Sequence, residues 1–299
     1  MEIEQKEQHS KFESWILASR PKTLLAAFVP VMVGSSIAFN EKQFVLVYAL
    51  VALICSVLIQ TGTNFVNDLY DFISGADNEK RKGPKRVLAS GLISENEMRT
   101  GIFLAFGLAF FLGLYLVYVR GILVLIIGVA SILAAIAYTT GPFPLAYKGL
   151  GDVFVFMFFG VVGTVGTFYV HTKEISLLSF LVSIPVGSLI TNILVVNNLR
   201  DIEEDKAAGK NTLAVRMGKT FTKYQFLFLI LISFFIPAIL FFFYNYSVII
   251  FLPYLTIPIA YKITYALFTT DGQSLNKTLE MTAKLSAIFG LLFSLALAI

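Results

Sequence analysis

The sequence predicts an all-α, polytopic membrane protein with nine transmembrane helices. Hydrophobic residues make up 57% of the 299-residue chain, charged residues only 14%, and the mean hydropathy is +0.79. Soluble domains carry about 25% charged residues, and long stretches of this chain lack the polar face of a soluble helix. The composition therefore excludes a soluble fold.

Nine apolar segments are long enough to cross a bilayer, since a span needs about 20 residues and flanking side chains extend its reach. Trp15 suits a membrane interface, and Pro21 suits the first turn of the first helix. The expected spans are, in order, Leu24–Phe39, Phe44–Asn64, Ile102–Val119, Ile122–Tyr138, Val153–Val170, Leu177–Val196, Phe226–Phe243, Val248–Tyr265 and Leu285–Ala298.

The positive charges predict the orientation of these spans. Of the 23 Lys and Arg residues, only Lys42, Arg120 and Lys173 fall on one side of the nine-span layout, which leaves 20 on the side of the N-terminus. Loops rich in Lys and Arg stay in the cytoplasm. We expect an integral protein of a bacterial cytoplasmic (inner) membrane, with the N-terminus inside and the C-terminus outside.

Two polar connections, residues 66–100 and 197–224, are much longer than the others. Long connections in a compact domain are usually functional, and both of these fall on the cytoplasmic side. The offset of 130 residues between Asn67 and Asn197 suggests two repeated four-helix units, followed by a ninth helix. We expect one domain over residues 1–299, with residues 1–14 as a polar tail.

The first long connection begins with a cluster of acidic and amide side chains. Asn67 and Asp71 are four residues apart, so they share one face of a helix, and Asp68 and Asp77 lie close by in sequence. Ionisable groups at the end of a membrane span are costly unless they are paired, solvated or bound to metal. Oxygen ligands of this kind suit Mg²⁺, and the single cysteine, Cys55, excludes a cysteine metal site.

The second long connection repeats the pattern. Asn197 and Asp201 are four residues apart, as are Asp201 and Asp205. Basic residues accompany both clusters, and guanidinium and ammonium groups bind phosphate oxygens. Those best placed are Lys85, Arg86, Arg200, Lys206, Lys210 and Arg216.

Other basic residues have two readings. Arg20 and Lys22 either anchor the first span at the cytoplasmic face or bind a diphosphate at a helix start. Lys80–Lys82 either set the topology and contact anionic lipid or contribute to the site.

No Walker A motif, dinucleotide-binding glycine pattern or Ser-His-Asp set is present. Phosphate chemistry without a nucleotide loop, inside a membrane, indicates a lipid-linked phosphate. If that group is an isoprenoid diphosphate, Mg²⁺ and cations stabilise the departing diphosphate. An electron-rich acceptor then traps the allylic carbocation.

These motifs resemble the UbiA superfamily of intramembrane aromatic prenyltransferases. That family carries Asn-x3-Asp-x3-Asp after helix 2 and Asp-x3-Asp after helix 6. Here Asn67 and Asp71 match the first motif, but Gly75 stands in the place of its last Asp, and Asp77 follows two residues later. The second motif, Asp201–Asp205, matches directly, and the nine-span layout extends the resemblance over nearly the whole chain.

Within the superfamily the chain most resembles the 1,4-dihydroxy-2-naphthoate polyprenyltransferases of menaquinone biosynthesis. The segments that carry this are Ala18–Thr23, Asn67–Asp77, Gly83–Arg86, Tyr138–Asp152 and Asn197–Leu213. The resemblance implies transfer of a polyprenyl chain from polyprenyl diphosphate to 1,4-dihydroxy-2-naphthoate. Carbon dioxide and diphosphate leave, and the product is demethylmenaquinone.

The resemblance also implies the roles of individual residues. Asp68, Asp71, Asp77, Asp201 and Asp205 are the candidate Mg²⁺ ligands, and the last four of these are candidate catalytic residues together with Tyr138. Tyr138 has a second reading as an interfacial anchor. The candidate diphosphate-binding residues are Arg20, Lys22, Asn67, Arg86, Lys148, Asn197, Arg200 and Lys210.

Two alternatives stay open at this point. One keeps the chemistry but changes the acceptor to 4-hydroxybenzoate, homogentisate or haem. The other is a cation or phosphate transporter with inverted repeats, although transporters place acidic residues near the membrane midplane. In all readings membrane lipid is a partner and nucleic acid is not.

Overall fold

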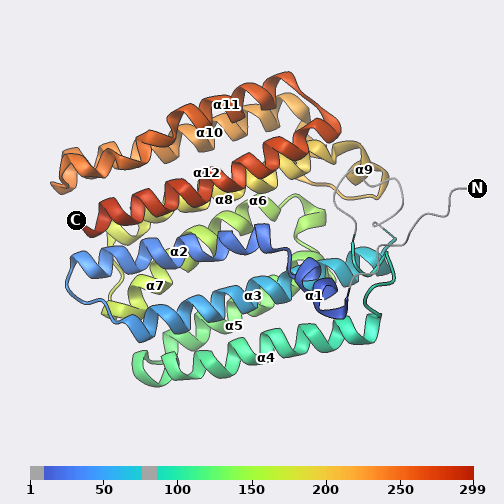
Figure 1. Ribbon diagram of the computed structural model, residues 1–299, viewed down its shortest axis with the longest axis horizontal. Helices are drawn as coiled ribbons and strands as arrows, with labels where there is room; N and C mark the ends of the chain where they lie inside the picture. Colours follow the sequence, from blue (N-terminus) through green and yellow to red (C-terminus); the bar gives the residue numbers. More distant parts are fainter. Residues whose placement is uncertain (1–9, 76–85) are drawn as a thin grey trace, which may run out of the picture.

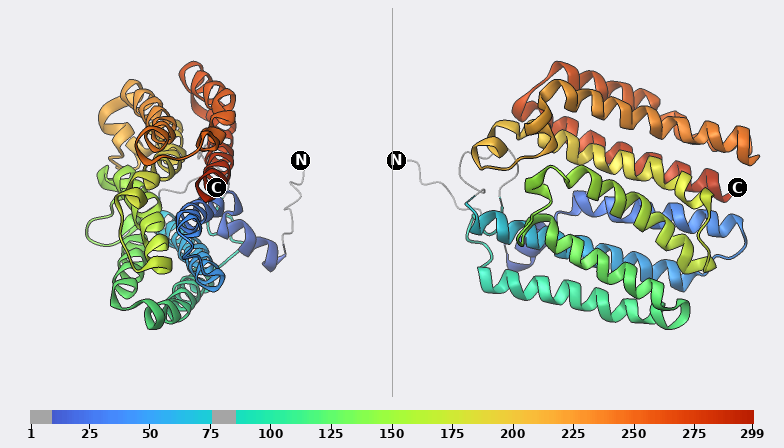
Figure 2. Two further views of the ribbon diagram at one scale, coloured as in Figure 1. Left: turned by 90° about the vertical axis from the view of Figure 1, so that its left-hand side faces the viewer. Right: turned by 180° about the vertical axis from the view of Figure 1, so that it is seen from behind.

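The computed structural model describes residues 10–75 and 86–299, and within them it contains nine helices long and apolar enough to cross a membrane. The predicted count of nine spans is confirmed. The helices run side by side along one axis (Figures 1 and 2). The spans are α2 (Pro21–Asn40), α3 (Leu46–Ile73), α4 (Glu95–Arg120), α5 (Ile122–Thr139), the continuous run of α6 (Gly151–Val155), η2 (Phe156–Val162) and α7 (Gly163–Thr172), α8 (Leu177–Arg200), α10 (Leu213–Tyr244), the pair η3 (Val248–Thr256) and α11 (Ile257–Thr269), and α12 (Leu275–Ala298).

Short helices complete the described part of the chain. Those that lie outside the spans are α1 (Lys11–Ser19), η1 (Ala146–Lys148) and α9 (Ile202–Ala207), while η4 (Gly272–Ser274) is a single turn that leads into α12. Figure 1 shows α1 and α9 at the same end of the bundle, and the C-terminus at the other end. We call the end that carries α1 and α9 the site end.

Several helices extend further than their apolar segments. Helix α3 continues beyond Asn64 to Ile73, and α4 begins at Glu95 because Ser94 forms a capping box with Glu97. The expected loops over 66–100 and 197–224 are therefore wrong in part. Residues 66–73, 95–100, 197–200, 202–207, 213–217 and 219–224 are helical, and α10 is kinked at Gly218, whose φ is 82°.

The N-terminal tail needs a similar correction. Residues 11–14 belong to α1, whose start is stabilised by a capping box between Ser10 and Glu13. Trp15 packs edge-on against Phe65 of α3, with ring centroids 5.2 Å apart. The chain is thus fixed to the bundle before the first span begins.

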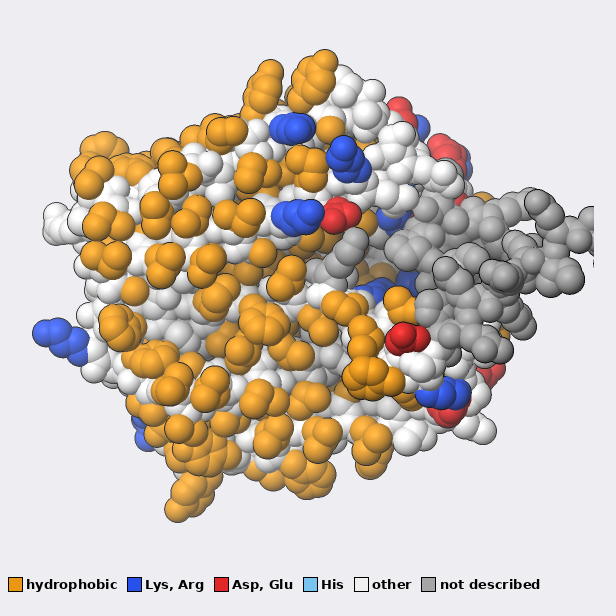
Figure 3. Space-filling model, in the orientation of Figure 1, with side chains coloured by type: hydrophobic (Ala, Val, Ile, Leu, Met, Phe, Trp, Pro, Cys, Tyr) orange, Lys and Arg blue, Asp and Glu red, His pale blue; other side chains and the backbone are white. Residues whose placement is uncertain are grey.

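Apolar side chains cover most of the face of the bundle that Figure 3 shows. On α10, Phe228, Phe235 and Phe242 are exposed at intervals of seven residues, which is one face of a helix. A spanning helix satisfies its own backbone polar groups, so such a face suits lipid. The protein is an integral membrane protein.

Close helix contacts set the position of η2. A Cβ added to Gly160 of η2 would lie 2.6 Å from the Cα of Gly187 in α8. Small residues let helix backbones approach in this way. A substitution at Gly160 would therefore push η2 away from α8.

Candidate active site

A cavity of about 1040 Å³ lies inside the bundle and is polar at the site end. Helices from both halves of the chain form its wall, including α2, α3, α5, the α6–η2 run and α8. Its deeper part is lined mainly by apolar side chains, among them Val124, Leu125 and Val170. The cavity therefore suits a ligand with a charged head and a long apolar tail.

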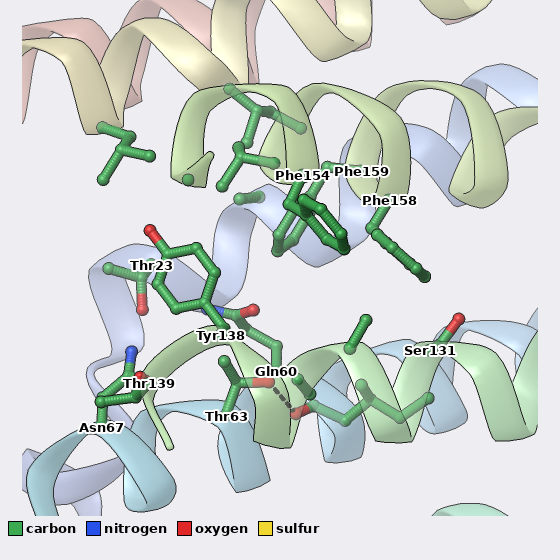
Figure 4. A pocket seen from close by; sticks show the side chains of 18 of the residues that line it. Thr23, Gln60, Thr63, Asn67, Ser131, Tyr138, Thr139, Phe154, Phe158 and Phe159 are labelled. Carbon is green, nitrogen blue, oxygen red and sulfur yellow. Dashed lines mark hydrogen bonds between the residues drawn. The ribbon is translucent and has the colours of Figure 1, made fainter. Parts of the chain in front are cut away.

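The first acidic motif lies on the last turns of α3. Asn67, Asp68 and Asp71 all line the cavity, as their spacing on one helix predicts. The side chain of Asn67 accepts a hydrogen bond from Thr139 of α5, which lies beside it in Figure 4. Asp68 is buried, and its Oδ1 lies 3.7 Å from Nε of Arg86.

Asp71 is the meeting point of three distant segments. Its Oδ2 accepts from Arg86 at 3.2 Å, and its Oδ1 accepts from Tyr147 at 2.9 Å and Lys210 at 3.0 Å. Lys210 belongs to the second long connection, 139 residues away. The two acidic regions are thus brought together, as the repeated pattern predicts.

The second acidic motif begins where α8 ends. Asp201 is buried and accepts two hydrogen bonds of 2.6 Å from Arg200, one from Nε and one from Nη2. Two further donors of Arg200 reach the Oδ1 atoms of Asn197 and Asn276, each at 2.8 Å. A planar guanidinium held at every edge is rigid, so Arg200 fixes the position of Asp201.

Asp205 follows on α9 and also lines the cavity. Burial raises the pKa of Asp205 to about 7, with Lys210 lowering it and the charges of Asp201 and Asp71 raising it. The raised pKa means that this carboxyl holds a proton more readily than an ordinary aspartate. A cation placed among these acids would favour its ionised form.

Arg20 joins the site from the start of the first span. It caps α2 with φ = 52°, a left-handed backbone conformation that costs a non-glycine residue about 1–3 kcal/mol, and it lines the cavity. The side chain of Lys22 and the whole of Asp77 lie outside the described residues.

The connection between α5 and α6 places Tyr147, and not Lys148, at the cavity. Lys148 is exposed, with Nζ 5.6 Å from the ring centre of Phe143, and it does not line the cavity. Its neighbour Tyr147 contacts Asp71 instead. Successive residues of a 3₁₀ turn point about 120° apart, so Tyr147 facing the site turns Lys148 away.

Tyr138 does line the cavity. Figure 4 shows its ring projecting from α5 into the space beneath the α6–η2 helix. A Cβ added to Gly151 would lie 3.2 Å from its hydroxyl oxygen. Tyr138 therefore faces the cavity rather than the lipid, as a residue near the reacting centre requires.

Sequence reasoning missed Asp152, which lines the cavity and is 6% exposed. Its Oδ2 accepts from Gln225 of α10 at 2.7 Å, and its Oδ1 is 3.4 Å from the donor nitrogen of Asn198 on α8. The signal was present, because a carboxylate at the start of an apolar span is rarely incidental.

Three aromatic side chains form an apolar wall next to this carboxylate. Phe154, Phe158 and Phe159 project from the α6–η2 run into the cavity (Figure 4), and Phe154 and Phe158 stack with centroids 5.8 Å apart. Aromatic faces attract cations. The wall therefore suits a carbocation as well as an isoprenoid chain.

The residues present fit a magnesium diphosphate. No three acidic side chains in the described part of the chain are close enough to hold a metal by themselves. Mg²⁺ usually binds through one or two carboxylates together with substrate phosphates, and Asp68, Asp71, Asp201 and Asp205 line one end of one cavity. The nearby Arg86, Arg200 and Lys210 supply the cations that a diphosphate also needs.

Comparison with known proteins decides the family. Residues 27–288 match the UbiA prenyltransferase family. The chain belongs to this family. It is therefore a prenyltransferase, an enzyme of the EC 2.5.1 class, and the predicted superfamily is confirmed.

Individual relatives support a narrower resemblance. The 1,4-dihydroxy-2-naphthoate octaprenyltransferase of Escherichia coli K12 is 35% identical over 298 residues, covering 97% of each chain. The enzyme of the same name from Haemophilus influenzae is 38% identical over 218 residues, covering 70% of this UbiA-family chain and 71% of its own.

Solved structures share the fold. A UbiA homologue from Archaeoglobus fulgidus bound to GPP and Mg²⁺ superposes with a TM-score of 0.69 at 17% identity, covering 95% of this chain and 99% of the other. The predicted all-α fold is thus confirmed.

Proposed function

We propose that the protein transfers a polyprenyl chain from polyprenyl diphosphate to 1,4-dihydroxy-2-naphthoate in a Mg²⁺-dependent reaction. The ring loses its carboxylate as carbon dioxide, and the product is demethylmenaquinone. One observation carries the proposal: Asp71 of α3 is joined to Lys210 of the second acidic region at the head of a long apolar cavity. The names of the relatives from E. coli and H. influenzae support the acceptor.

The acidic residues form one end of the proposed substrate site. Asp68, Asp71, Asp201 and Asp205 would hold Mg²⁺, with Asn67 and Asn197 assisting them. Asp77 and Lys22 keep the roles that the family resemblance gave them. When bound, Mg²⁺ neutralises charge on the leaving diphosphate.

The basic residues bind the diphosphate. Arg86 and Lys210 now contact Asp71, and Arg200 contacts Asp201. Phosphate oxygens would offer these cations new acceptors, which would leave the carboxylates able to hold the metal. Arg20 lies on the same cavity wall.

The apolar residues protect the reactive chain. As the bond to diphosphate breaks, positive charge develops at the first carbon of the prenyl group. Phe154, Phe158 and Tyr138 present aromatic faces to the cavity. Excluding water there prevents hydrolysis of the prenyl cation.

We also propose that the site end lies in the cytoplasm and the C-terminus outside, because the Lys and Arg residues gather on the side of the N-terminus. The test is a pair of reporters. One fused after Ile299 is expected to be active only outside, and one inserted at Asn78 only inside. The opposite pattern contradicts the orientation.

The decisive assay supplies purified protein, Mg²⁺ and a polyprenyl diphosphate with carboxyl-labelled 1,4-dihydroxy-2-naphthoate. Labelled carbon dioxide is expected to leave in step with prenylated product. Efficient prenylation of 4-hydroxybenzoate with its carboxylate retained would assign another acceptor instead. Family membership already sets the transporter alternative aside.

A further inference from the structure

Asp152 is the one buried carboxylate on the cavity wall whose hydrogen-bond donors, among the described residues, are both carboxamides. Gln225 and Asn198 supply them, at 2.7 and 3.4 Å. By contrast, Asp71 contacts two cations and Asp201 contacts a guanidinium. No ion pair involves Asp152 in residues 10–75 and 86–299.

Asp152 lies outside the proposed diphosphate site but close to it. Asn198 contacts Asp152, and the adjacent Asn197 contacts Arg200 of the second acidic motif. Tyr138 lies on the other side, since its hydroxyl oxygen is next to Gly151. Asp152 thus lies at the border between the polar head of the cavity and its aromatic wall.

The charge of Asp152 limits which ligand groups it can bind. A carboxylate without a cation repels a diphosphate. It attracts a neutral hydroxyl group, which can donate a hydrogen bond. An ionised carboxylate has about four lone-pair positions, and the two carboxamides use two of them, so Asp152 can accept from a ligand as well. The long contact leaves Oδ1 the less engaged of its two oxygens.

We propose that Asp152 binds and deprotonates the acceptor hydroxyl next to the ring carbon that is prenylated. This inference rests on the proposed function, because 1,4-dihydroxy-2-naphthoate carries its 1-hydroxyl beside its carboxylate-bearing carbon. An accepted hydrogen bond pushes electron density into the ring. The ring carbon then attacks the prenyl group more readily.

The step balances without any further reactant. The ring carbon bonds to the first carbon of the prenyl group, the carbon–oxygen bond to diphosphate breaks, and diphosphate leaves with that electron pair. The hydroxyl proton passes to Asp152, so the ring oxygen becomes a ketone beside the carboxylate. This β-keto acid loses carbon dioxide, the freed electron pair flows to the ketone oxygen, and Asp152 returns the proton.

The test begins with Asp152→Asn, which keeps the size of the side chain and an acceptor for Gln225. A purely structural role predicts turnover within threefold of wild type. We expect turnover to fall about 10²-fold or more, the usual contribution of a general base, with the KM for polyprenyl diphosphate within twofold. Magnesium-dependent binding of that diphosphate reports folding, and Asp152→Ser replaces the Asn variant if that one does not fold.

Methylated acceptors provide a matched pair of inhibitors. For wild type, 1-methoxy-4-hydroxy-2-naphthoate is expected to bind at least about tenfold more weakly than the 4-methoxy-1-hydroxy isomer, since a hydrogen bond to a charged group is lost. In Asp152→Asn the two isomers are expected to bind within about threefold of each other.

Three results overturn the inference: turnover of Asp152→Asn within threefold of wild type, equal binding of the isomers by wild type, or the same preference in wild type and variant. The proposed function fails separately, if wild type does not prenylate dihydroxynaphthoate.

Discussion

The two ends of the bundle hold their buried polar groups in different ways. At the site end, Asp71 and Asp201 are paired with cations, and Asp71 draws them from two separate segments. At the far end, His171 of α7 is 2% exposed and accepts a hydrogen bond from the backbone N–H of Val45 at 3.1 Å. Its Nε2 lies 3.1 Å from the hydroxyl oxygen of Ser35.

The far end also contains a cation, but no carboxylate meets it in the described residues. Arg120 donates to the backbone oxygen of His171 at 2.9 Å and lies 4.4 Å from the ring centre of Tyr48. Because Nδ1 accepts from Val45, the other ring nitrogen carries the proton and donates to Ser35. The Val45 contact satisfies the N-cap residue of α3, and Arg120 is held by a backbone oxygen and an aromatic ring rather than by a carboxylate.

The difference teaches that polar burial in this protein has two purposes. Ion pairs at the site end can exchange partners when a metal diphosphate arrives. Hydrogen bonds at the far end fix the helices from which the cavity is built. Substitutions at the site end are therefore expected to lower turnover, and substitutions at the far end to lower the free energy of unfolding.

The largest expected effect comes from Asp71→Asn. This change removes a metal-binding charge, so turnover is expected to fall about 10³-fold or more. Radiolabelled prenyl transfer by purified protein measures it. The control is the thermal unfolding midpoint in detergent, which should change little because the carboxamide oxygen of the variant can still accept a hydrogen bond from Tyr147. Near-normal turnover would refute the shared site.

A second variant pair separates two lysines that the sequence predicted to bind diphosphate. Lys210→Met removes the cation that contacts Asp71, and turnover is expected to fall about 10- to 100-fold as one charged hydrogen bond to diphosphate is lost. Lys148→Met is the matched control and is expected to stay within twofold. An equal loss of turnover in both variants would show that Lys148 also acts at the site.

These lysines also show what the sequence alone could and could not predict. Spans and acidic motifs follow from hydropathy and spacing, which are local properties, so nine helices and Asp71 were predictable. Which of Tyr147 and Lys148 faces the cavity depends on the phase of a three-residue turn. Asp152 was missed because its donors are 46 and 73 residues away.

The third prediction concerns pH at the site end. Mg²⁺ binds the ionised form of Asp205, whose pKa of about 7 lets protons compete below neutrality. Apparent Mg²⁺ affinity is therefore expected to rise about tenfold from pH 6 to pH 8 and then level off. Titration of activity with Mg²⁺ at each pH measures this affinity. The Asp205→Asn variant is expected to show a smaller dependence of Mg²⁺ affinity on pH. An unchanged dependence in the variant would show that Asp205 is not the titrating ligand.

The smallest effect on turnover is expected from His171→Phe at the far end. The variant keeps the ring that stacks on Phe44 but leaves the Val45 N–H without its acceptor. The free energy of unfolding is expected to fall by about 1–3 kcal/mol, measured by denaturation in detergent. Turnover per folded molecule should stay within twofold, and a specific loss of turnover would contradict the separation of the two ends.

The π-helical stretch η2 joins these two ends within a single span. Its i→i+5 hydrogen bonds place an extra residue in each turn, so it acts as an angular offset between α6 and α7. One extra residue in an ordinary α-helix would turn everything beyond it by about 100°, one residue's share of a 3.6-residue turn, and the wider π-helical turn takes up that rotation within Phe156–Val162. The aromatic wall can therefore face the cavity while His171 of the same span contacts Val45. A lipid bilayer requires only apolar side chains in this span, so the π-helical stretch serves the orientation of these two groups.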